Sequence, residues 1–253
     1  MTIRMKKFEK VIEKLFFKGK ETKWSKWLSY MIVDVILMIL IFYIILNKII
    51  YGITGSLYPP GSGFRLNFLG DDYIPFIPQM VIFYYYLFYS MVIISMIYFA
   101  IIIPEKGYAF GWSLVIINII ADIVYLFFPV SSFVWREQIL ANASQYQGNF
   151  FAQVVFGIYN TDTSFNCFPS LHAAVSTITF YAWYRYYKRN PNWEKLIIAI
   201  ITFIVAAGVI LSTLFVKQHY ILDEIAGMLL AYLVGRFIFN RFWKSSNLDF
   251  NSV

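Results

Sequence analysis

The segment from Leu196 to Val216 reads LIIAIITFIVAAGVILSTLFV and contains no charged residue. An apolar run of this length is what an α-helix needs to cross a hydrocarbon core of about 30 Å. A helix also satisfies its own backbone hydrogen bonds, which lipid cannot do for an irregular segment. The stretch therefore predicts a transmembrane helix, and it sets the class of fold.

Five further apolar runs are long enough for the same structure. They extend over about Trp27–Leu46, Gln79–Ile103, Tyr108–Phe128, Pro169–Tyr187 and Tyr220–Phe239. Of the 253 residues, 60% are hydrophobic and only 14% are charged, whereas a soluble chain carries about 25% charged residues. The sequence predicts an all-α fold, a polytopic bundle of six transmembrane helices over residues 27–241. It excludes an ordinary water-soluble enzyme and a disordered regulator.

The basic residues indicate how this bundle is oriented. The formal net charge is +7, and most lysines and arginines fall in segments that six spans would place on one side. The exceptions, expected on the outer side, are Lys48, Arg65, Arg136 and Lys217. Because cytoplasmic loops carry the excess of basic residues, both termini are predicted to be cytoplasmic in a multi-pass protein of the cell membrane. The same bias explains the basic pI without nucleic acid as a partner.

The two ends of the chain flank the membrane domain. In residues 1–26, apolar side chains recur at helical spacing between lysines, which is typical of a basic amphipathic helix on an anionic membrane surface. A plain charged anchor fits these residues equally well. No secretory signal is predicted, because a long charged segment precedes the first span. Residues 242–253 are expected to form a cytoplasmic tail.

The only two histidines of the chain are both predicted at the outer interface of the membrane. His172 lies where the fourth span begins, and His219 lies in the short turn before the sixth span. If a helix begins at that turn, Asp223 shares a face with His219. The carboxylate is then expected to accept a hydrogen bond from one imidazole nitrogen, which leaves the other as an oriented nucleophile or base.

An anion-binding site is predicted beside these residues. Pro169 suits the first turn of the fourth helix, where free backbone N–H groups and the Ser170 hydroxyl would bind a phosphate. Arg136 and Lys217 are expected to contribute positive charge. No cluster of carboxylates or cysteines accompanies them, so neither a metal nor a cofactor is expected. Haem or metal ligation by the histidines, and a proton path in a transporter, are the alternatives for such residues.

These residues resemble the type 2 phosphatidic acid phosphatase superfamily of membrane lipid phosphatases and phosphotransferases. That family carries the stretches KxxxxxxRP, PSGH and SRxxxxxHxxxD. The second is present as Pro169–His172, with leucine in place of glycine. The first is reduced to Arg136, with Pro129 at the lysine position and Glu137 at the proline position.

The third stretch keeps its spacing from Ser212 through His219 to Asp223, with Thr213 at the arginine position. Because threonine carries no charge, Lys217 is expected to supply the missing cation. The sequence around both histidines is most similar to that of the branch that contains inositol phosphorylceramide synthases, which transfer a phosphoryl headgroup between lipids.

The resemblance implies a role for each site residue. His219 would attack phosphorus and form a phosphohistidine, oriented by Asp223. His172 would protonate the leaving lipid oxygen and then act as the base for the acceptor. Arg136 and Ser170 would bind the phosphate oxygens and stabilise the five-coordinate state.

The function expected from this resemblance is hydrolysis of a lipid phosphate or diphosphate ester at the outer face of the membrane. The substrate would be a membrane phospholipid or a polyprenyl phosphate. Headgroup transfer between lipids is the alternative, and a transporter or inactive relative is the third possibility. The oligomeric state is left open. Among the remaining acids, Asp71 and Asp72 are expected to be solvated, and Asp122 to be structural, bracing Arg136 or Lys217.

Overall fold

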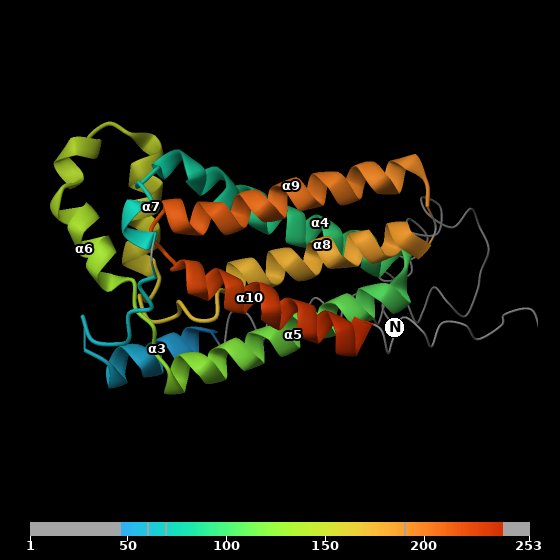
Figure 1. Ribbon diagram of the computed structural model, residues 1–253, viewed down its shortest axis with the longest axis horizontal. Helices are drawn as coiled ribbons and strands as arrows, with labels where there is room; N and C mark the ends of the chain where they lie inside the picture. Colours follow the sequence, from blue (N-terminus) through green and yellow to red (C-terminus); the bar gives the residue numbers. More distant parts are fainter. Residues whose placement is uncertain (1–46, 60, 69, 190, 240–253) are drawn as a thin grey trace, which may run out of the picture.

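The computed structural model describes residues 47–59, 61–68, 70–189 and 191–239 (Figure 1). Within these ranges the chain is helical, and only isolated bridges, of Val130 with Phe64 and Asn166, resemble strand pairing. The predicted all-α fold is therefore confirmed. The first predicted span, Trp27–Leu46, and the two terminal segments, 1–26 and 242–253, lie outside the described residues.

Five long helices form an elongated bundle (Figure 1). They are α4 (Phe88–Ile102), α5 (Pro104–Phe127), α8 (Leu171–Arg189), α9 (Trp193–Phe215) and α10 (Ile221–Val234), the last continued by a π-helical turn, Gly235–Phe239. Each coincides with one of the apolar runs of the sequence. The polar side chain of Asn192 begins α9 by accepting a hydrogen bond from the backbone N–H of Lys195, at 2.8 Å, as an N-cap does.

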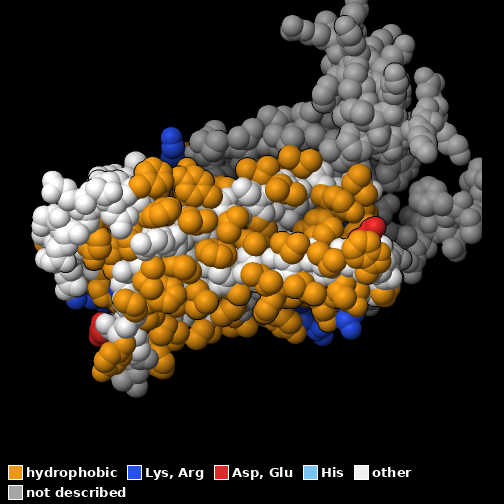
Figure 2. All heavy atoms as spheres, turned by 90° about the horizontal axis from the view of Figure 1, so that it is seen from above, with side chains coloured by type: hydrophobic (Ala, Val, Ile, Leu, Met, Phe, Trp, Pro, Cys, Tyr) orange, Lys and Arg blue, Asp and Glu red, His pale blue; other side chains and the backbone are white. Residues whose placement is uncertain are grey.

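Among the described residues, three helical stretches are long and apolar enough to cross a membrane. They are Pro78–Ala100, Ala109–Phe127 and Trp193–Phe215, which match the second, third and fifth predicted spans. Figure 2 shows that hydrophobic side chains cover much of the long side of the bundle, with few charged side chains among them. These helices indicate a membrane protein, and the count of six spans stays a prediction.

Helix α8 lies at the centre of the bundle, where it contacts α4, α5, α9 and α10. Its inner residues include Ile178, which is fully buried, and Trp183, whose indole N–H donates to the Ser95 hydroxyl at 2.9 Å. A helix surrounded by protein on several sides needs no uniformly apolar surface. This explains why α8 carries more polar residues than α9.

The stretch between the third and fourth predicted spans contains two short helices that the apolar runs of the sequence do not predict. It forms α6 (Phe133–Ala141) and α7 (Phe150–Thr161), with a 3₁₀ turn, Ala143–Tyr146, between them. Figure 1 shows both helices at one end of the bundle. The side chain of Asn149 begins α7 by accepting the N–H of Ala152 at 3.1 Å. This end of the bundle is thus covered by helices.

The segment before α4 has an unusual helical geometry. A 3₁₀ turn, Pro78–Met80, leads into a π-helical stretch, Ile82–Leu87, and π-helical turns occur frequently at functional sites. This stretch packs on α9 at Gly208, where a Cβ atom would overlap the ring of Phe83. The close contact fixes the side chains that follow Phe83, among them Tyr84.

Candidate active site

The candidate site forms where two turns meet at the end of the bundle that carries α6 and α7. The backbone N–H of Ser170, just before α8, donates to the carbonyl oxygen of Asp223 in α10 at 3.0 Å. Gly227 permits this approach, because a Cβ atom there would overlap the carbonyl oxygen of Ser170. The contact brings the rings of His172 and His219 to a centroid separation of 5.8 Å. The predicted convergence of the two histidines is therefore present in the fold.

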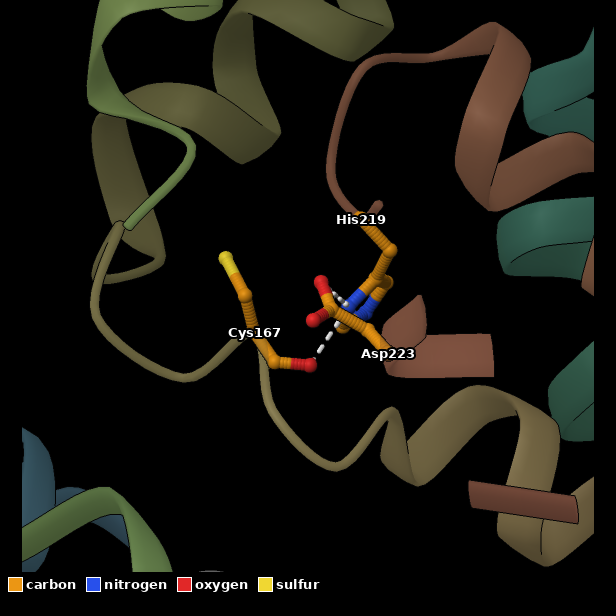
Figure 3. Close-up of side chains that lie close together, drawn as sticks. All are labelled: Cys167, His219 and Asp223. Atoms are coloured by element: carbon orange, nitrogen blue, oxygen red, sulfur yellow. Dashed lines mark hydrogen bonds and ion pairs between the residues drawn. The ribbon is translucent and has the colours of Figure 1, made fainter. Parts of the chain in front are cut away.

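The imidazole of His219 is held by the backbone. Its Nδ1 lies 2.9 Å from the carbonyl oxygen of Cys167, and Figure 3 shows this contact across the gap between the two turns. A carbonyl only accepts hydrogen bonds, so Nδ1 carries the proton in this arrangement. Nε2 then carries the lone pair, as a nucleophile requires.

Asp223 lies farther from Nδ1 of His219 than the carbonyl oxygen of Cys167 does. Its Oδ2 lies 3.6 Å from Nδ1 of His219 and accepts the backbone N–H of Tyr220 at 2.8 Å, at the start of α10. Burial alone lowers the pKa of His219, but the contact with Asp223 and the negative charge of Glu224 outweigh it. The pKa of His219 is consequently raised above its ordinary 6.5. The hydrogen-bond acceptor of Nδ1 is thus the backbone carbonyl of Cys167, whereas the sequence predicts the carboxylate of Asp223.

His172 is positioned by aromatic rings. It lies in the first turn of α8 and stacks on Tyr84 at a centroid distance of 4.3 Å, with Phe88 at 4.8 Å. Tyr84 comes from the π-helical stretch and is itself buried. This stacking fixes the plane of the imidazole.

Both histidines line one cavity of about 280 Å³. Five tyrosines contribute to the wall, and they are Tyr51, Tyr84, Tyr85, Tyr89 and Tyr125. The remaining lining residues are Lys48, Ile158, Thr161, Asp162, Asn166 and Leu171. Ligand pockets typically have volumes of about 300–1,000 Å³, so this cavity is close to the lower end of that range.

Arg136 lies beside the cavity with its guanidinium already bonded to the chain. It donates to the Ser132 hydroxyl at 3.0 Å, to the carbonyl oxygens of Asp162 and Thr163 at 2.9 and 3.1 Å, and to the side-chain oxygen of Gln218. It is buried, and it does not line the cavity. In this arrangement Arg136 ties the end of α7 to the turn that carries His219.

Lys217 is likewise engaged by protein groups. Its ammonium donates to the backbone carbonyl of Asp71 at 3.0 Å and lies 4.5 Å from the ring centroid of Trp135. Burial lowers the pKa of Lys217 from its ordinary value. The residue has a positive φ of 54°, and its side chain is not part of the cavity wall.

Asp71 corrects one expectation from the sequence. It is fully buried, and its carboxylate accepts the backbone N–H of Ile221 at 2.9 Å and that of Phe68 at 2.7 Å. The expectation that Asp71 is solvated is wrong, because the segment that carries Asp71 folds over the start of α10. Asp72 is exposed and accepts a hydrogen bond from Asn67, as expected for a solvated residue.

Two further polar positions have protein partners. The Ser170 hydroxyl accepts the backbone N–H of Ala173 at 3.2 Å and so begins α8. The Thr213 hydroxyl donates to Glu224 at 2.8 Å. Glu224, which is buried next to the turn that carries His219, was not singled out from the sequence, although it adjoins Asp223. A buried Thr213–Glu224 pair thus lies where the third stretch of the family, SRxxxxxHxxxD, has its arginine.

Asp122 does not brace the cations as predicted. It is buried in α5, but Arg136 and Lys217 have the partners described above. Among the described residues, neither carboxylate oxygen of Asp122 has a hydrogen-bond partner. Its expected contact with those cations is therefore wrong, because the outer segments supply their acceptors.

Cys167, His219 and Asp223 are close enough for their ligand atoms to lie within 4.8 Å of one another. In Figure 3, however, the carbonyl oxygen of Cys167 faces the imidazole, whereas the sulfur extends in another direction. The thiol lies 3.3 Å from the carbonyl oxygens of Ser164 and Gln218, and burial raises its pKa to about 12. A thiol in this state is a poor metal ligand.

Of the six predicted site residues, His172 and His219 line the cavity. Asp223 lies behind His219, whereas Arg136, Ser170 and Lys217 hold the surrounding turns together. Their predicted roles in phosphate binding stay predictions.

Comparison with known proteins identifies the family. A family model described as PAP2 superfamily matches residues 71–237, a range that includes both histidines, Arg136 and Asp223. No curated protein and no solved structure matches the chain. The matched range covers most of the chain and all six predicted site residues, and the chain belongs to the PAP2 superfamily.

Proposed function

We propose that the protein is a membrane enzyme that cleaves a lipid phosphate ester through a phosphohistidine. Membership of the PAP2 superfamily supports a phosphatase or phosphotransferase type of activity. The observation that carries the proposal is the placement of His172 and His219 in one cavity, with Nδ1 of His219 bonded to the backbone. This leaves Nε2 available for attack on phosphorus.

The reaction follows from this placement. Nε2 of His219 attacks phosphorus, a nitrogen–phosphorus bond forms, and the bond from phosphorus to the lipid oxygen breaks. His172, whose ring lies 5.8 Å away, donates its proton to the departing oxygen. In the second half, His172 takes a proton from water, the water oxygen bonds to phosphorus, and His219 and phosphate are released. Asp223 stabilises the positive charge on His219 during the intermediate.

Water is the acceptor in the leading form of the proposal, and an alcohol is the second. One observation favours the alcohol. Asn166 donates to Asp162 at 3.0 Å, and both line the cavity with His219. A carboxylate and an amide are suited to hydrogen-bond the hydroxyl groups of an alcohol acceptor or headgroup. Such an enzyme would transfer a phosphoryl headgroup between lipids, where the first form would release phosphate.

The cavity is proposed to face the extracytoplasmic side of the cell membrane. The support is the distribution of basic residues along the sequence, since cytoplasmic loops carry the excess. The lipid would then enter with its headgroup at the outer interface and its chains in the bilayer.

The test is turnover by purified protein in detergent with EDTA, with a panel of lipid phosphates and phosphodiesters. Wild type, His219→Ala and the matched variant His219→Gln are compared, with phosphate release and headgroup exchange followed in parallel. We expect product from wild type and a loss of at least about 10³-fold in both variants, since each lacks the nucleophile. Phosphate release supports hydrolysis, whereas exchange without phosphate supports transfer. Product formation that survives in the His219 variants would refute the mechanism.

A further inference from the structure

A cavity that binds a lipid phosphate needs positive charge, because the phosphate oxygens carry negative charge in every step of the reaction. The cations predicted from the sequence do not supply it in this arrangement. Arg136 donates to four protein acceptors, and Lys217 donates to the carbonyl of Asp71. Neither side chain lines the cavity. The inference that follows rests on the function proposed above.

One lysine does line the cavity together with both histidines, and it is Lys48. It lies in the first turn of α3 (Asn47–Leu57) and is exposed. No hydrogen bond or ion pair engages its side chain among the described residues. Its ammonium is therefore available to an anion, whereas the guanidinium of Arg136 and the ammonium of Lys217 already donate to protein acceptors.

Helix α3 holds Lys48 firmly against the site. Ile50 is buried against Ala121 and Tyr125 of α5. At the other end of the helix, the Tyr58 hydroxyl donates to the carbonyl of Leu126 at 3.0 Å. A helix anchored at both ends fixes where its lysine emerges, so the entropy lost on binding an anion is reduced.

Tyr51 adds a second group from the same helix. It follows Lys48 by three residues and therefore lies on the same face, and it also lines the cavity. Burial raises the pKa of its phenol far above the ordinary value, so the hydroxyl stays protonated and can donate to a phosphate oxygen. Lys48 and Tyr51 thus form a cationic and hydrogen-bonding wall of the cavity.

We infer that Lys48 binds the phosphate of the lipid substrate and stabilises the charge that develops on its oxygens during phosphoryl transfer. Asp162, also in the cavity wall, has its negative charge balanced by Arg136 at 3.9 Å. Lys48 therefore remains available for the substrate. Helix α3, which lies before the matched family region, thereby contributes a substrate-binding residue.

The experiment compares wild type, Lys48→Ala and Lys48→Arg with Arg65→Ala as a matched control. Arg65 is exposed on the same outer segment and is absent from the cavity wall. We expect Lys48→Ala to lower kcat/KM roughly 10- to 100-fold, the range for a lost hydrogen bond to a charged group. It should also weaken product inhibition by inorganic phosphate by at least about tenfold. Lys48→Arg should restore most of both, and Arg65→Ala should leave both unchanged.

The inference is overturned if wild type shows His219-dependent turnover while Lys48→Ala matches Arg65→Ala in kcat/KM and in phosphate inhibition. If wild type shows no such turnover, the proposed function fails, and the second measurement decides on Lys48 alone. Thermal unfolding in detergent is then measured with and without inorganic phosphate. Stabilisation of wild type and Arg65→Ala that is lost in Lys48→Ala supports the anion site. Equal responses in all three proteins overturn it.

Discussion

Replacing Gly227 by alanine tests whether the contact between α8 and α10 sets the geometry of the site. The new methyl group would overlap the carbonyl oxygen of Ser170 and would lie only 3.0 Å from the Cβ of Ala173 and 3.2 Å from the backbone nitrogen of Ala174. These atoms belong to the backbone and first turn of α8, so the clash cannot be relieved by a side-chain rotation. The start of α8, which carries His172, has to move.

The size of the effect follows from this displacement. Overpacking in a closely packed core costs about 1–3 kcal/mol, and a methyl group that meets backbone belongs at the upper end of that range. A shift of about 1 Å in a catalytic group costs about 10²-fold in rate. We therefore expect Gly227→Ala to lower the free energy of unfolding by about 2–3 kcal/mol and kcat by about 100-fold.

The assay pairs unfolding in detergent with turnover of the same preparation. Gly157→Ala is the control, because Gly157 lies in α7 and a Cβ atom there meets nothing within 4 Å. Alanine is favoured over glycine in a helix by about 1 kcal/mol, so the control should be as stable as wild type or more stable. A Gly227→Ala protein with wild-type stability and wild-type kcat would refute the reasoning about the α8–α10 contact.

Two further predictions concern the charged groups. Because attack requires neutral His219 and its pKa is raised above 6.5, kcat/KM should increase with pH through a value above 6.5. Asp223→Asn removes the contact and the charge that raise this pKa, so the acid limb of the pH–rate profile should move to lower pH, and an unmoved limb would contradict the assignment. Asp71→Ala removes the acceptor for the Ile221 N–H and should cost about 1–2 kcal/mol, as a lost helix cap does. Thermal unfolding should show no comparable loss for the exposed Asp72→Ala, and equal losses in both would disprove the capping role.

The sequence contains enough information to predict the helices and the pairing of the histidines. Long apolar runs with one charged residue or none predict the positions of α5 and α9, because a helix in lipid needs a continuous apolar sequence. The spacing of His219 and Asp223 suits a helix that begins at their turn, and α10 begins there, at Ile221. These features are local, and local patterns are what a single sequence records.

The features that the sequence does not predict depend on tertiary contacts. Helix α7 was missed because it is too short for a span, although Asn149 at its start is a recognisable cap signal. The partners of Arg136 come from three separate segments, so no spacing rule reveals that its donors are already occupied. The position of Lys48 in the cavity likewise depends on how α3 packs on α5.

The hydrogen bond from Ile221 to Asp71 joins residues that are 150 positions apart. The first residue of helix α10 is therefore capped by a side chain from a distant segment of the chain. If the segment that carries Asp71 were replaced by that of a relative, the hydrogen bond at the start of α10 would be replaced with it. A graft that keeps Asp71 in place should preserve the turn that carries His219. A graft that shifts Asp71 by one residue should lower activity, although Asp71 does not line the cavity.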